Sequence, residues 1–188
     1  MNSRLLEIRW HGRGGQGAIT AAKILAQAAY LGGYRGVTAA PYFGAERRGA
    51  PVSASTRIAA APVHVMSQVE NPDIVVVLDH TLLSGEDVTS GLNSDGWLVV
   101  NTWHKPQDLD LRGPFNVATA DATRVCYELG LIVAGLTVVN TAILGALVRA
   151  TEIVDLPSVE KAVATRFSDS ALAVNLAAIR NTYEATLL

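Results

Sequence analysis

The stretch Ile8-Arg9-Trp10-His11-Gly12-Arg13-Gly14-Gly15-Gln16-Gly17 decides how this chain is expected to fold. It joins an apolar run, residues 5–10, to an alanine-rich run, residues 18–29, through four glycines within six positions. A strand, a glycine loop and a helix in this order point backbone N–H groups and a helix N-terminus at an anionic group. The glycines also match the spacing G-x-G-x-x-G, which alone indicates a nucleotide site only weakly.

Length and composition favour one domain over residues 1–188. Of the 188 residues, 49% are hydrophobic and only 17% are charged, whereas about a quarter are charged in a typical soluble domain. The scarcity of charge has two explanations, a surface partly covered by other subunits or an alanine-rich core.

Charge, hydropathy and cysteine content exclude several classes of protein. A net charge of -2 gives no basic surface for nucleic acid. No apolar run reaches the roughly eighteen residues of a membrane span, and the first residues lack the layout of a signal peptide, so we expect a cytoplasmic protein. The single cysteine, Cys126, excludes a disulfide, and it excludes an iron–sulfur or zinc site held by cysteines of this chain alone. Its apolar neighbours predict a packed thiol.

Hydrophobic periodicity predicts an α/β fold. The expected strands cover residues 5–10, 36–40, 52–58, 73–78, 97–100 and 115–118, and residues 63–66 are expected to pair with 52–58 as a hairpin. The expected helices cover residues 18–31, 122–129, 138–150, 158–167 and 170–187. Strand–helix alternation followed by a helical C-terminal tail predicts a Rossmann-like three-layer sandwich with a mainly parallel sheet.

Polar residues follow several of the predicted strands. The glycine loop follows the first, and Asp79-His80, Asn101-Thr102 and residues 119–121 follow later ones. Because ligands of such sheets bind outside the carboxyl ends of the strands, we expect some of these groups to share one edge. Asp79 and His80 could form an acid–base pair, but nothing completes a triad, so capping of a turn is favoured.

The residues after the second predicted strand argue against a dinucleotide site. A Rossmann dehydrogenase places an acid about twenty residues past the glycines to bind the ribose, yet residues 37–41 hold no carboxylate. Arg47 and Arg48, in a loop with two prolines and two glycines, instead offer bidentate contacts to phosphate or carboxylate. The residues alone leave open a phosphorylated ligand, an acidic partner surface and a solvated charge pair.

Two segments taken together resemble a known family. Residues 12–17 followed by 43–52, with Glu46-Arg47-Arg48-Gly49-Ala50-Pro51 at its centre, are similar to the gamma subunit of pyruvate:ferredoxin oxidoreductase and related 2-oxoacid oxidoreductases. The resemblance covers nearly the whole chain, through residues 57–58, 72–79, 140–141 and 175–178. It favours the pyruvate-type branch. Ala45 and residues 137–139 depart from that pattern and leave the substrate open, an aryl 2-oxoacid such as phenylglyoxylate included.

The resemblance implies a function for the assembled enzyme. In this family a 2-oxoacid is oxidatively decarboxylated to acyl-CoA and CO2, with electron transfer to ferredoxin or a similar acceptor. Thiamine diphosphate, magnesium and iron–sulfur clusters belong to partner chains among the alpha, beta and delta subunits. This chain is then expected to hold no catalytic or metal-binding residue, and to cover and help bind coenzyme A. The implied contacts are Gly14, Gly15, Gln16, Gly17, Arg47, Arg48 and Asn140.

Two alternatives to this function stay open, a stand-alone nucleotide-binding dehydrogenase and a structural scaffold subunit. Arg13 either faces the ligand or anchors a partner subunit, and His11 is expected to make a structural hydrogen bond. The apolar stripe of the last predicted helix is expected to join the core, with an interface as the alternative.

Overall fold

A mixed sheet forms the centre of the computed structural model, which describes residues 4–42, 49–65, 67–133 and 135–188. Its strands, in the spatial order β2-β3-β1-β4-β5-β6, are β1 (Leu6–Arg13), β2 (Gly36–Tyr42), β3 (Pro51–Ala59), β4 (Ile74–Val77), β5 (Trp97–Asn101) and β6 (Asn116–Ala120). Strand β4 pairs parallel with β1 and with β5, and β5 pairs parallel with β6. Strand β3 pairs antiparallel with both β1 and β2. The expected mainly parallel α/β fold is confirmed.

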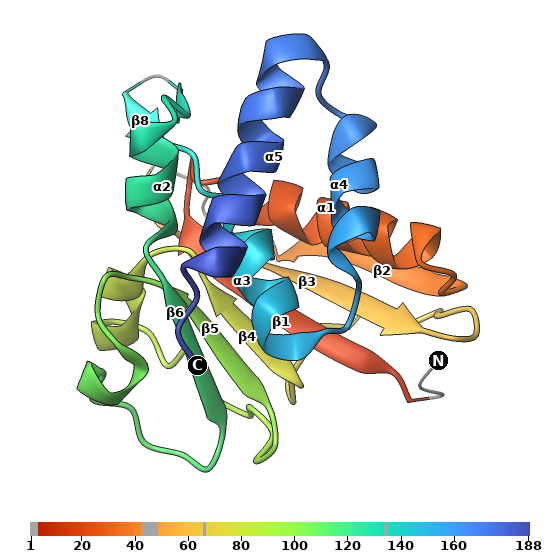
Figure 1. The fold of residues 1–188 in the computed structure, drawn as a ribbon. Helices are drawn as coiled ribbons and strands as arrows, with labels where there is room; N and C mark the ends of the chain where they lie inside the picture. Colours follow the sequence, from red (N-terminus) through yellow and green to blue (C-terminus); the bar gives the residue numbers. More distant parts are fainter. Residues whose placement is uncertain (1–3, 43–48, 66, 134) are drawn as a thin grey trace.

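Helices cover one face of this sheet (Figure 1). They are α1 (Ala18–Leu31), α2 (Ala122–Glu128), α3 (Ala142–Thr151), α4 (Leu156–Ala164) and α5 (Asp169–Glu184). The opposite face is covered by two 3-10 turns, η1 (His80–Ser84) and η2 (Pro106–Asp108), and by loops whose apolar side chains pack on β4 and β5. The sheet thus lies between a helical layer and a layer of turns and loops.

The opening strand is tied to its neighbours by a buried polar chain. The indole of Trp10 donates to the hydroxyl of Thr56 in β3 at 3.0 Å, and this hydroxyl donates to the carbonyl of Ala22 in α1 at 3.0 Å. Trp10 is fully buried. Because the first strand, its neighbour and the first helix are fixed together, the glycine loop between β1 and α1 starts and ends on rigid elements.

Two expected elements differ in the structure. The hairpin of residues 63–66 is wrong, because β1 and β2 occupy both edges of β3; Met66 lies outside the described residues. The Arg57 side chain instead donates to the carbonyls of Val65 and Ser67 at 3.3 and 2.8 Å. The helix expected from residue 138 begins at Ala142, since the Val138 N–H donates to the Leu131 carbonyl beside a small hairpin of β7 (Ile132–Val133) and β8 (Leu136–Thr137).

The last helix carries its expected stripe into the core. Ile179 is fully buried, and Leu172, Leu176 and Tyr183 pack against the same core. Helix α5 ends at Glu184, and Leu187 beyond it pairs with Thr119 along the edge of β6. The chain end therefore covers the β6 edge of the sheet.

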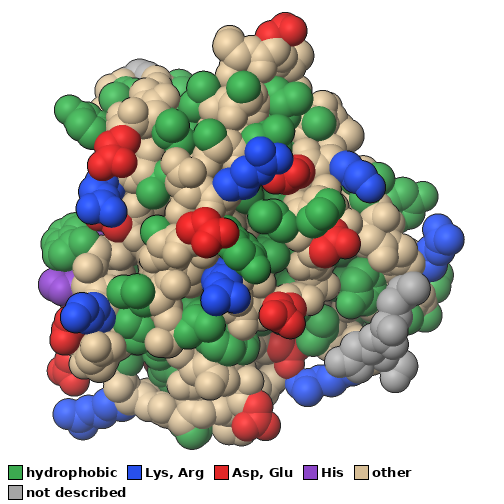
Figure 2. Space-filling model, in the orientation of Figure 1, with side chains coloured by type: hydrophobic (Ala, Val, Ile, Leu, Met, Phe, Trp, Pro, Cys, Tyr) green, Lys and Arg blue, Asp and Glu red, His purple; other side chains and the backbone are tan. Residues whose placement is uncertain are grey.

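The outer surface carries mixed charge. Figure 2 shows Lys and Arg side chains interspersed with Asp and Glu over the face that it presents. None of the helices that the structure describes combines the length and apolarity needed to cross a membrane.

Candidate functional site

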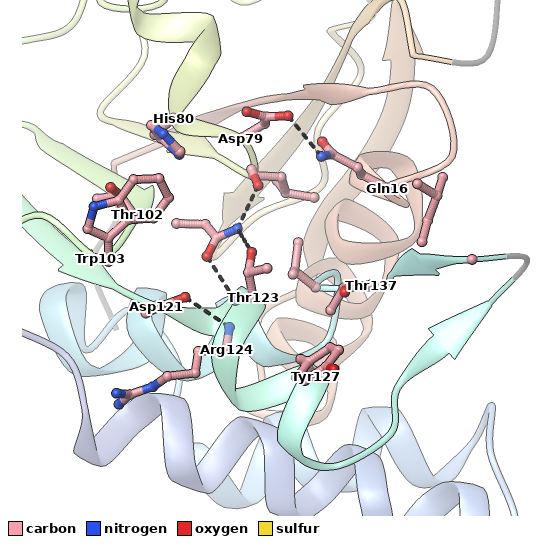
Figure 3. Close-up of a pocket in the computed structure, with 15 residues that line it drawn as sticks. Gln16, Asp79, His80, Thr102, Trp103, Asp121, Thr123, Arg124, Tyr127 and Thr137 are labelled. Atoms are coloured by element: carbon pink, nitrogen blue, oxygen red, sulfur yellow. Dashed lines mark hydrogen bonds between the residues drawn. The ribbon is translucent and has the colours of Figure 1, made fainter.

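A pocket of about 550 Å³ lies at the carboxyl ends of β4, β5 and β6 (Figure 3). Asp79, Asn101 and Asp121, one from the end of each strand, line it, as do His80 and Thr102. Gln16 brings the glycine loop to the same pocket. The expectation that these polar groups share one edge is confirmed.

The floor of the pocket is built by Asn101. Its amide nitrogen donates to the Leu78 carbonyl and to the Thr123 hydroxyl, both at 2.8 Å, and its oxygen accepts from the Thr123 N–H at 3.1 Å. The side chain is nearly buried, at 5% exposure. Since both amide hydrogens and the oxygen are engaged, the floor is rigid and electrically neutral.

Asp79 is the polar hub of the site. Its Oδ1 accepts from the Thr81 N–H at 3.0 Å and from the Thr81 hydroxyl at 2.6 Å, which caps η1. Its Oδ2 accepts from Arg13 Nε and from Gln16 Nε2, both at 3.1 Å. The capping role expected for Asp79 is confirmed, and the same carboxylate also fastens the glycine loop to the end of β4.

The environment of Asp79 keeps it ionised. Burial acts to raise its pKa, but hydrogen bonds from the Thr81 hydroxyl and N–H and from Gln16, together with the charge of Arg13, outweigh burial and lower the pKa below its ordinary value. Asp79 is therefore present as a carboxylate, ion-paired with Arg13 at 3.1 Å.

Gln16 and Arg13 lock the loop from within. The Gln16 oxygen accepts from the Arg13 N–H at 2.7 Å, and the Gln16 N–H donates to the Arg13 carbonyl at 3.0 Å. The Arg13 guanidinium also reaches the Gly49 carbonyl at 3.2 Å and the Thr81 hydroxyl at 2.8 Å. Arg13 thus holds the loop within this chain, a role that neither alternative from the sequence described.

The glycine loop ends at the uncapped start of α1. Gly17 is the N-cap, with a left-handed φ of 82°, no side chain caps the helix, and its first turn contains no acid. Gly15, with a φ of 98°, also needs the conformational freedom of glycine. The first N–H groups of α1 have no acceptor within the helix and carry its positive dipole end.

Asn140 lies against the same helix end. A Cβ added to Gly17 would approach Asn140 Nδ2 to 2.5 Å, so the amide occupies the space that the glycine leaves. Asn140 is 8% exposed, and its side chain makes no hydrogen bond to the described residues. The amide therefore keeps its full hydrogen-bonding capacity for a ligand.

Gly49 lies against the glycine loop. Arg47 and Arg48 lie outside the described residues. Gly49, the next residue of the chain, donates its N–H to the Gly14 carbonyl at 3.1 Å, and the Gly14 N–H donates to the Ala50 carbonyl at 2.8 Å.

Other reactive side chains have structural surroundings. Burial raises the pKa of the Cys126 thiol to about 12, consistent with the packed thiol expected. His11 accepts from Arg9 Nε at 3.1 Å, and burial, then the Arg9 charge, lowers its pKa to about 4. Among the described residues, no three His, Cys, Asp or Glu side chains gather as metal ligands.

The strand order also separates this site from a dinucleotide site. Strand β3 lies between β1 and β2, so the end of β2 is two strand spacings, about 10 Å, from the glycine loop. An acid at the end of β2 would therefore stand far from a nucleotide bound at that loop.

The family follows from comparison with known proteins. The family model of pyruvate ferredoxin/flavodoxin oxidoreductase matches residues 7–185. The chain belongs to this family. The pyruvate/ketoisovalerate oxidoreductases common subunit gamma of Pyrococcus furiosus is 46% identical to it over 185 residues, 97% of each chain. The pyruvate synthase subunit PorC of Methanothermobacter thermautotrophicus is 46% identical over 180 residues, 96% of this chain and 95% of the relative.

A solved structure agrees with these pyruvate ferredoxin oxidoreductase relatives. The crystal structure of pyruvate oxidoreductase subunit PORC from Thermotoga maritima matches with a TM-score of 0.83 at 40% identity, covering 97% of each chain. The chain is therefore a gamma-type subunit of a 2-oxoacid oxidoreductase, and the resemblance predicted from its sequence is confirmed.

Several pocket residues were not predicted. Trp103, Thr123 and Tyr127 line the pocket beside the expected groups. Trp103 directly follows Asn101-Thr102 in the chain, so the same strand-end argument extended by one residue would have found it. Tyr127 lies inside a helix and carries no such signal.

Proposed function

We propose that this chain covers and helps bind coenzyme A in a thiamine-diphosphate-dependent 2-oxoacid oxidoreductase. The assembled enzyme would convert a 2-oxoacid and coenzyme A to acyl-CoA and CO2 and pass electrons to ferredoxin or a similar acceptor. Relatives named for pyruvate and ketoisovalerate favour a 2-oxoacid of that kind.

One observation carries the proposal, the uncapped start of α1 with the unpartnered Asn140 amide beside it. Backbone N–H groups of Gly15 and Gly17 and of the first turn suit a phosphate, because they donate hydrogen bonds at the positive end of the helix dipole. Asn140 Nδ2, which lies against Gly17, can donate a further hydrogen bond there.

The other predicted contacts differ in how many hydrogen-bond donors they can offer to coenzyme A. The N–H groups of Gly14 and Gln16 already donate to the Ala50 and Arg13 carbonyls. Gln16 Nε2 donates one of its two hydrogens to Asp79 and keeps the other for a ligand. Arg47 and Arg48 would add charge-assisted contacts to the phosphates. The chain then acts by placing the coenzyme A thiol near a partner's intermediate, which is a proximity effect.

The remaining cofactors fit the partner subunits better than this chain. Thiamine diphosphate with magnesium supplies the decarboxylation chemistry when bound, and the clusters accept the electrons. An iron–sulfur cluster is held by about four cysteines, whereas this chain has only Cys126. We therefore assign these groups to the alpha, beta and delta chains, inside the cytoplasm.

The test uses the assembled enzyme with Arg47→Ala, Arg48→Ala and Asn140→Ala. Loss of a charge-assisted hydrogen bond of about 1.5–3 kcal/mol corresponds to roughly 10- to 150-fold in the apparent KM for coenzyme A. Electron release to a viologen dye at saturating coenzyme A should stay near normal. Arg112→Ala, at an exposed arginine of another loop, serves as the control. An unchanged KM in all three variants would overturn the proposal and favour a scaffold.

A further inference from the structure

The pocket beside the glycine loop has an aromatic mouth. Trp103, after β5, is 64% exposed, and Tyr127, on α2, is 69% exposed. The rings of His80 and His104 contact the Trp103 indole at centroid distances of 4.5 and 5.1 Å. The indole is thus held in place by its neighbours while most of its surface stays open to a ligand. Figure 3 shows Trp103 beside His80 at the pocket.

The interior of this pocket does not suit an anion. The carboxylates of Asp79 and Asp121 line it, the former ion-paired with Arg13 at 3.1 Å and the latter capping α2. Arg124 also lines the pocket. The floor consists of the satisfied Asn101 amide with Leu78 and Val139 beneath it. Because both carboxylates and the Asn101 amide already have partners and the other walls are apolar or aromatic, a neutral group with an apolar face suits the interior better than a phosphate.

We propose that this pocket receives the adenine ring of coenzyme A, stacked on Trp103. The inference rests on the proposed function, in which the phosphates lie at the start of α1. On one side of its pyrophosphate coenzyme A carries the neutral pantetheine, and on the other side an adenosine whose base is neutral but whose ribose bears a further phosphate. Since the pantetheine thiol must reach a partner subunit, the adenosine is the arm that stays with this chain.

The geometry joins the two halves of this ligand. Gln16 belongs to the glycine loop and also lines the pocket. If the phosphates of coenzyme A bind at the loop, the adenosine attached to them therefore reaches the pocket. The ribose phosphate of coenzyme A then lies at the mouth, near Arg124, whose ion pair with Glu128 is loose at 3.8 Å and highly exposed. This arginine is free to turn toward an anion there.

The test separates the two arms of coenzyme A in the assembled enzyme. Trp103→Ala should raise the apparent KM for coenzyme A and the inhibition constant of adenosine 3′,5′-bisphosphate by roughly 5- to 150-fold, the loss typical of base–aromatic stacking. The KM for pantetheine, which lacks the adenosine, should not change. Trp103→Phe keeps an aromatic face and should stay within a few-fold of the unaltered enzyme.

Other outcomes overturn the inference in distinguishable ways. An equal rise in KM for pantetheine would place the opposite arm in the pocket, and dissociation of Trp103→Ala from its partners on a sizing column would make the indole a subunit contact. If Trp103→Ala leaves KM unchanged while Arg47→Ala or Arg48→Ala raises it, the adenine site is refuted and the proposed function stands. If none of these variants changes KM, both fail.

Discussion

The contact between Gly17 and Asn140 supports a prediction about stability. Gly17→Ala places a methyl group at a residue with φ 82° and at 2.5 Å from Asn140 Nδ2, closer than real side chains approach. Gly130→Ala is the matched control, because Gly130 has φ 72° and no described atom lies within 4 Å of its added Cβ. Both variants carry the same left-handed strain and the same change in the unfolded chain, and only the first carries the collision.

The difference between the two variants isolates the contact. Left-handed strain costs about 1–2 kcal/mol in either variant, and displacing a packed side chain adds about 1–3 kcal/mol in Gly17→Ala. Urea denaturation of the chain, followed by circular dichroism, should therefore show Gly17→Ala less stable than Gly130→Ala by about 1–3 kcal/mol with equal m-values.

A second background tests the cause of that difference. In Asn140→Ala the Nδ2 and Cγ atoms are gone and only Cβ remains, at 3.0 Å from the added methyl carbon. The extra cost of Gly17→Ala should then fall below about 1 kcal/mol. Equal stability of Gly17→Ala and Gly130→Ala in the unaltered background would refute the close packing of Asn140 on the helix start.

Three further predictions concern buried groups. Gly145→Ala, whose methyl would lie 2.1 Å from the Ile179 carbonyl, should destabilise the chain by about 1–3 kcal/mol or more, measured by urea denaturation against the open Gly85→Ala. Cys126 should resist iodoacetamide at pH 8 until the chain is unfolded, because burial raises its pKa to about 12; rapid native labelling would contradict this. Burial and Arg9 lower the pKa of His11 to about 4, so the unfolded chain binds the extra proton and stability should fall as pH drops from about 6.5 toward 4. His11→Gln should flatten that pH dependence, and an unaltered slope would exclude His11 as its source.

The fold was predictable where local signals were strong. Helix α1 begins and ends where the sequence analysis expected, because glycines flank an alanine-rich run on both sides. The buried strands β4 and β5 were found from continuous β-branched residues. The sequence does not show which segments compete for the edges of a strand. Strands β1 and β2 both pair with β3, and this excludes the expected hairpin of residues 63–66.

The sequence predicted at which edge of the sheet the site lies, but not the hydrogen bonds between its side chains. Strand ends placed Asp79 and Asn101 beside the glycine loop, since carboxyl ends of parallel strands meet at one edge. No pattern in the sequence could show that Asp79 divides its two oxygens between Thr81 and the loop, or that the buried Arg57 side chain holds a loop by its carbonyls. Those bonds join residues up to 66 positions apart.

The hydrogen bonds of Asp79 make the two sides of the glycine loop electrostatically different. One carboxylate oxygen accepts from both Arg13 and Gln16, so the side of the loop that faces the pocket is already neutralised from within. The other side, at the start of α1, keeps its N–H groups and the Asn140 amide without acceptors among the described residues. An anion is therefore attracted to the helix end, whereas the neutralised side that faces the pocket offers it no comparable attraction. A ligand that combines phosphates with a neutral ring satisfies both halves at once, whereas a simple carboxylate or phosphate satisfies only one.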